Sequence, residues 1–117
     1  MAALIGPNVG VSYGWTTRES GWNVGMDANL KLLDAVLQLS VKSRIVASPP
    51  ATPAKGDRYI VAANPSGAWV GKTNQIAVLV EGTWSFYIPK IGWACFIEDE
   101  AVLSAYKATG WSPGLAL

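Results

Sequence analysis

The sequence predicts a small α+β fold, in which an extended N-terminal arm and one amphipathic helix precede an antiparallel β-meander, assembled as a homotrimer. Residues 24–39 carry apolar side chains at helical spacing, and from residue 56 the spacing changes to that of strands separated by turns. Half of the 117 residues are hydrophobic and only 15% are charged, against about a quarter charged in typical soluble domains. A chain this small cannot bury so many apolar side chains alone, so we expect part of its surface to contact other subunits.

The N-terminal arm, residues 1–23, contains several glycines, which favour extended chain and turns over helix. Its aromatic residues are Tyr13, Trp15 and Trp22. Disordered tails are usually poor in aromatic residues. We therefore expect these three rings to lie against a partner protein or a neighbouring subunit, and docking onto the chain's own domain is the alternative.

The helix predicted over residues 24–39 has two apolar stripes instead of one. Met26, Leu30, Leu33 and Leu37 form the first, at the spacing of heptad positions a and d. Leu32, Val36 and Leu39 form the second. At about 100° per residue the apolar arc spans roughly 220°, and a helix that packs on one core needs only about 100°. Asn23 is the expected N-cap.

One small sheet cannot cover both stripes of this helix. We therefore predict a helix bundle at a symmetry axis, because closed symmetry would bury the second stripe. The predicted oligomer interface comprises six residues, and which stripe faces the axis is left open. These residues are Met26, Leu30, Leu33, Leu37, Leu32 and Val36.

The remaining chain divides into a connector and a β domain. Residues 40–55 contain Pro49, Pro50 and Pro53, which exclude helix and favour an extended connector. Residues 56–117 are predicted to form the β-meander, with one helical turn around Trp69 and a last strand near Trp111. The other expected strands are residues 58–63, 75–80, 83–88, 93–97 and 102–106.

The residue types exclude most catalytic chemistry. Histidine is absent and Cys95 is the single cysteine, so neither a His-based triad nor a Cys/His zinc site is available. The acidic residues 98–100 are adjacent, so their side chains point to opposite sides and predict a solvated turn. Residues 67–74 (GAWVGKTN) depart from the spacing of a phosphate-binding loop. We expect no enzyme activity, no catalytic residue, no metal and no cofactor.

Charge and hydropathy bear on the partners. The net charge is +1 and the basic residues are scattered, so no basic stripe predicts nucleic-acid binding. The first ten residues lack the basic start of a signal peptide. No apolar run approaches the roughly 20 residues that cross a bilayer, so membrane insertion is not expected.

The six tryptophans leave two interpretations open. Aromatic rings exposed on a sheet could stack on sugar rings, and Trp69 and Trp84 are the candidates for glycan stacking, with Trp69 expected to be the more exposed. In the alternative interpretation, Trp84, Trp93 and Trp111 fill the core of a thin sheet. The turns before Trp84 and Trp111 resemble each other, since GTWS and TGWS each place a Trp just after a turn that contains glycine.

Several motifs between residues 56 and 111 occur in an order that indicates a family. They are GDRYIV, GAW, QIA, GTWSFYIP, GW and the final Trp111. This order resembles a small phage-tail domain of unknown function, which occurs in tail-fibre proteins and in relatives from gene-transfer agents. The upstream segment YGWTTRESGWNVGMDANLKLLDAV is similar to a segment that often precedes this domain in phage fibre proteins.

The resemblance implies a component of a bacteriophage tail fibre or baseplate, often trimeric, located in the virion tail after synthesis in the host cytoplasm. It implies attachment to other tail proteins, a role that we assign to Tyr13, Trp15 and Trp22, and a contribution to host attachment. It supplies no catalytic residues. The alternative function is a carbohydrate-binding module that recognises host surface glycan through exposed tryptophan.

Overall fold

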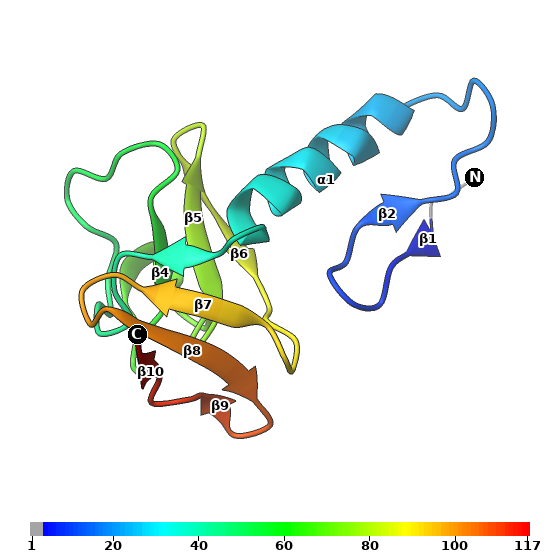
Figure 1. Ribbon diagram of the computed structural model, residues 1–117. Helices are drawn as coiled ribbons and strands as arrows, with labels where there is room; N and C mark the ends of the chain where they lie inside the picture. The colour runs from blue at the N-terminus through cyan, green and yellow to red at the C-terminus, as the bar shows by residue number, and fades with distance from the viewer. Residues whose placement is uncertain (1–3) are drawn as a thin grey trace. The chain divides into compact units, whose positions relative to one another are not determined.

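The computed structural model describes residues 4–117, which form two compact units, residues 4–37 and Gln38–Leu117. The first unit contains one helix and a short hairpin, and the second consists mostly of β-strands (Figure 1). The combination confirms the predicted small α+β class. No helix among the described residues is both long enough and apolar enough to span a lipid bilayer.

The N-terminal unit begins with a hairpin, where the sequence predicted an extended arm. Strand β1 (Leu4–Ile5) pairs antiparallel with β2 (Ser12–Tyr13), and the Gly6 N–H donates to the Val11 carbonyl at 2.7 Å. An isolated two-stranded hairpin is marginally stable. Its position therefore depends on contacts with the helix that follows.

Helix α1 (Trp22–Val36) begins and ends earlier than residues 24–39. Its N-cap is Gly21, which has a φ of 81° that glycine adopts without steric cost, so the expected cap Asn23 lies inside the helix. At the other end Gln38 has a φ of 52°, and the Leu39 carbonyl accepts a hydrogen bond from the Phe96 N–H. The helical periodicity of the sequence continues to Leu39, but in the structure this residue packs in the first apolar cluster of the β unit and bonds to Phe96.

The second unit contains two sheets. One has the order β10-β8-β7-β3 with β9 beside β8, and the other has the order β4-β5-β6. All pairings are antiparallel except that of β3 with β7. The elements are β3 (Ser40–Val41), β4 (Arg58–Ile60), the 3-10 helix η1 (Gly67–Trp69), β5 (Ile76–Val80), β6 (Thr83–Tyr87), β7 (Ala94–Ile97), β8 (Val102–Lys107), β9 (Gly110–Trp111) and β10 (Leu115–Ala116).

The predicted single meander is therefore divided between β6 and β7, and the first part of the predicted connector joins the two halves. On one side of this segment the Glu98 N–H donates to the Val41 carbonyl at 2.9 Å. On the other side the Lys42 N–H donates to the Arg58 carbonyl and the Ile60 N–H to the Ser43 carbonyl. Residues 39–46 thus lie between β7 and β4, and only the proline-rich remainder is a connector.

Two apolar clusters stabilise this unit. The first contains Leu39, Val41, Ile60, Ile76, Cys95 and Ile97, with Tyr87, Trp93, Val102 and Trp111 packed against it. The second contains Tyr59, Val61, Trp69 and Ala77, with Val46, Trp84 and Phe86. Alternate residues of β4 and β5 belong to alternate clusters, as the two faces of a strand require. The sheet β4-β5-β6 is consequently covered on both faces.

Candidate functional site

The side chain of Asn29 connects α1 to the N-terminal hairpin through the two hydrogen bonds that a neighbouring strand would form. Asn29 is buried, its Oδ1 accepts from the Ser12 N–H at 2.7 Å, and its Nδ2 donates to the Ser12 carbonyl at 2.8 Å. One amide therefore satisfies both polar groups of a β2 residue. The sequence does not predict this contact, because a polar residue such as Asn29 on an amphipathic helix is normally expected to face solvent.

Trp15 lies over the same helix at Gly25. A Cβ added to Gly25 would overlap Cζ2 of the indole and lie 3.1 Å from Cε2. The missing side chain thus makes room for the ring. Of the three predicted docking residues, Trp15 packs inside its own unit, whereas Tyr13 and Trp22 are each 51% exposed. For Trp15, the structure therefore agrees with the alternative interpretation, in which the arm packs on its own chain.

The predicted interface residues of α1 differ in exposure. On the first stripe Leu30 is 57% exposed and Leu37 is 69% exposed, while Met26 and Leu33 are partly buried. On the second stripe Leu32 is buried and Val36 is partly buried. Trp22 lies beside the first stripe on the helical projection, since it precedes Met26 by four residues. We call this face of α1 the exposed stripe: its exposed side chains are Trp22, Leu30 and Leu37, and the partly buried Met26 and Leu33 lie between them.

The expectation that Trp69 presents an exposed ring was wrong, because this side chain is fully buried. Its ring centroid lies 5.5 Å from that of Tyr59, at a tilt, and 5.2 Å from that of Trp84, edge to face, within the range of packed aromatic pairs. Its indole N–H has no hydrogen-bond partner among residues 4–117. Trp84 is partly buried in the same cluster, so the structure places both proposed glycan-stacking rings in packing positions.

The remaining candidate groups are occupied by structural contacts. Burial raises the pKa of the Cys95 thiol to about 12, so the reactive thiolate is disfavoured at neutral pH. Lys72, in the segment compared with a phosphate loop, places its Nζ 5.1 Å from the Phe86 ring centroid. Among the described residues no group of three or more His, Cys, Asp or Glu side chains could hold a metal ion.

The acidic turn after β7 is anchored to the segment that joins the sheets. The Ser40 hydroxyl donates to Glu98 at 2.6 Å, and the Arg44 guanidinium binds both carboxylate oxygens of Glu100, at 2.8 and 2.9 Å. These bonds lower the pKa of the Glu100 carboxyl and raise the pKa of Arg44. Arg44 also donates to the carbonyls of Ser112 and Pro113, at 2.7 Å each. The guanidinium therefore holds the last segment of the chain.

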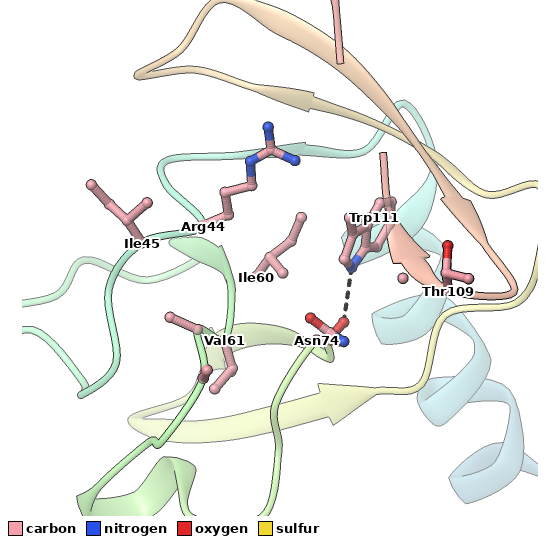
Figure 2. A pocket seen from close by; sticks show the side chains of 10 residues that line it. Arg44, Ile45, Ile60, Val61, Asn74, Thr109 and Trp111 are labelled. Atoms are coloured by element: carbon pink, nitrogen blue, oxygen red, sulfur yellow. Dashed lines mark hydrogen bonds between the residues drawn. The ribbon is translucent and has the colours of Figure 1, made fainter. Parts of the chain in front are cut away.

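An open pocket of about 520 Å³ lies beside this guanidinium. Figure 2 shows aliphatic side chains on one side, including Ile45 and Ile60, and Trp111 with Thr109 on the other. The Trp111 indole N–H donates to the Asn74 carbonyl at 3.0 Å, which joins two turns into one wall. The sequence contains no direct signal for this pocket, because its lining residues come from separate segments, at residues 44–45, 60–63, 74 and 109–111.

Comparison with known families identifies the chain. Residues 26–112, well over half of its length, match the family described as "Protein of unknown function (DUF2793)". The chain belongs to the DUF2793 family. A comparison with curated proteins found no match.

The extent of the DUF2793 match differs from the extent of the motifs seen in the sequence. Those motifs begin at residue 56, whereas the match begins at Met26, inside α1, and ends at Ser112, directly after β9. It therefore includes most of the exposed stripe, the segment between the sheets and every residue that lines the Trp111 pocket. Both candidate surfaces belong to the family domain, and β1 and β2 precede it.

Proposed function

We propose that this DUF2793 protein is a non-enzymatic structural module of a bacteriophage tail, in the fibre, baseplate or tail tip, that assembles as an oligomer through α1. The observation that carries the assembly is the exposed stripe. Large apolar side chains exposed together are typical of interaction surfaces, and Leu30 and Leu37 are more than half exposed. The helical spacing of four, three and four residues supports packing against identical helices.

The assignment to a phage tail rests on the resemblance between residues 56 and 111 and phage-tail domains, together with the resemblance upstream. Tyr13 and Trp22, both half exposed, are the residues we propose for contact with other tail proteins. Immunogold electron microscopy of virions from the phage that encodes the chain tests this assignment. Label on the tail supports it, and virions without label would overturn it.

Substitution of Leu30 by Glu tests the assembly. Because Leu30 is exposed, the change should alter the stability of one protomer by no more than about 0.5 kcal/mol. It should nevertheless dissociate the oligomer, since it places a charge in an apolar interface. Size-exclusion chromatography with light scattering gives the mass, and circular dichroism verifies that the variant is folded.

Ala28 provides the matched control, because it is exposed on the same helix but lies outside the stripe. Ala28→Glu introduces the same side chain and should leave the oligomer intact. A wild-type protein that is monomeric at all concentrations would contradict the assembly. An oligomer that survives Leu30→Glu would place the interface elsewhere.

The carbohydrate-binding alternative rests on the six tryptophans, with Trp69 and Trp84 as the stacking rings. Because Trp69 is buried and Trp84 packs partly buried against the same cluster, neither ring supports it.

A further inference from the structure

We propose that the pocket beside Trp111 is a binding site for a neutral saccharide, separate from the assembly surface on α1. Its walls come from residues 44–45, residues 60–63 with Asn74, and the turn that contains Thr109, Gly110 and Trp111. These segments lie far apart in the sequence, and the fold of the second unit brings them together. The proposal does not depend on the oligomeric state.

The wall that contains Trp111 is rigid. The ring packs against the first apolar cluster and makes an edge contact with Tyr106 at 5.1 Å between centroids. The bond from its indole N–H to the Asn74 carbonyl is the third contact that holds the ring. Binding to a preformed wall requires little additional ordering of side chains, which reduces the entropic cost of association.

The positive charge that lines the pocket is already balanced. Each guanidinium nitrogen of Arg44 is already bonded, to Glu100 or to the carbonyls of Ser112 and Pro113, and the Glu100 carboxylate balances its charge. Three groups remain for a ligand: the Asn74 amide and the Thr109 hydroxyl, which bond to no other group within residues 4–117, and the second N–H of Arg44 Nη1. The charge of Arg44, the cation among the residues that line the pocket, is already balanced by Glu100, so the pocket does not favour an anion.

The pocket also has an apolar part, supplied by Ile45, Ile60 and the Trp111 ring (Figure 2). A ligand that fits the pocket needs hydroxyl groups that bond to the Asn74 amide and the Thr109 hydroxyl. It also needs an apolar C–H face that packs on the aliphatic and aromatic side chains. A sugar ring combines these two properties. Small-molecule sites in general pair an apolar lining with a few placed polar groups.

The test is a titration of the isotope-labelled full-length protein, followed by nuclear magnetic resonance. Glucose, galactose and N-acetylglucosamine serve as neutral probes and glucuronate as an anionic probe, each to about 50 mM, because single sugars bind weakly and a millimolar Kd corresponds to about 4 kcal/mol. At least one neutral sugar should produce saturable shifts of the Trp111 indole signal and of the Thr109 and Gly110 amides. The exposed Trp22 serves as the internal control for non-specific stacking.

Two variants remove the polar groups without disturbing the wall. Asn74→Gly keeps the carbonyl that holds Trp111 and tolerates the φ of 69° found there, and Thr109→Val keeps the shape of the side chain. Each should weaken binding about three- to tenfold, the range for one lost hydrogen bond. Thr52→Val, on an exposed residue outside the pocket, should leave the affinity unchanged.

Several results would overturn the proposal. These are the absence of saturable shifts with every neutral sugar, equal shifts at Trp22, stronger binding of glucuronate, or unchanged affinity in both pocket variants.

Discussion

Gly25 shows how one absent methyl group can position a ring. In an exposed helix, replacing Gly by Ala normally stabilises the protein by about 1 kcal/mol. Here the new Cβ would overlap Cζ2 of Trp15, so the indole must move. We expect Gly25→Ala to displace Trp15 and to offset or reverse the usual gain in stability. Urea denaturation gives the free energy of unfolding, and the Trp15 indole signal reports the displacement.

The same substitution in a Trp15→Ala background provides the control. Without the ring the overlap disappears, so Gly25→Ala should there stabilise the protein by about 1 kcal/mol, the ordinary difference in helix propensity. The difference between the two backgrounds is the coupling energy of the pair. Equal effects in both backgrounds would contradict the packing of Trp15 on Gly25.

Among the elements, the C-terminal segment after β9 depends on Arg44. The guanidinium holds two carbonyls of this segment and both oxygens of Glu100, and hydrogen bonds to charged groups contribute about 1.5 to 3 kcal/mol each when well formed. Arg44→Ala should therefore increase amide hydrogen exchange in β10 and residues 112–114. Arg44→Lys should protect them incompletely, because an ammonium cannot reproduce the planar fork.

The contribution of Glu100 should depend on pH. Arg44 holds the pKa of this carboxyl below its ordinary value of 4.5, so its stabilising effect is fully present above that value and is lost as the pH falls through the lower folded pKa. Glu100→Gln should destabilise the protein at neutral pH. Because Glu100 is partly exposed, the loss should be about 1 kcal/mol or less.

Denaturation of wild type and Glu100→Gln across the acid range provides the measurement. The two stabilities should converge as the pH falls below the lowered pKa of the folded state, since the wild-type carboxyl is then protonated in both states. A difference that stays constant as the carboxyl titrates would contradict the role of its charge.

The elements predicted from the sequence are those with local signals. Strands β5 and β6 lie where apolar runs flank a two-residue turn, and Glu81 and Gly82 both have positive φ, as such a hairpin requires. The helix around Leu30 follows from its periodicity. Strand β3 has no comparable signal, because it is two residues long and its partner, Phe96–Ile97, is more than fifty residues away.

The errors at the candidate site have the same origin. Trp69, between two glycines, has the local pattern of an exposed turn, but the aromatic cluster with Tyr59 and Trp84 buries it. Exposure depends on long-range packing, which one sequence does not display. The wall formed by Asn74 and Trp111 likewise depends on a hydrogen bond between residues 37 positions apart.

For the whole molecule, the distribution of the apolar clusters separates folding from assembly. Both clusters of the second unit consist of residues from Leu39 onward, so the packing within each cluster lies inside this unit. The proposed assembly surface, in contrast, lies in the first unit, at residues 22–37. One chain would thus contain a β unit that folds by its own packing and a helix that recruits other copies.

A fragment of residues 38–117 tests this separation directly. We expect it to retain the dispersed methyl and indole signals of a packed β core, because Trp69 and Trp111 pack on residues inside it. We expect light scattering to give the mass of a monomer, since the fragment lacks the exposed stripe. An unfolded fragment would show that residues 4–37 are needed for the core to fold. A folded fragment that forms oligomers would show that the assembly surface lies on the sheets and not on the helix.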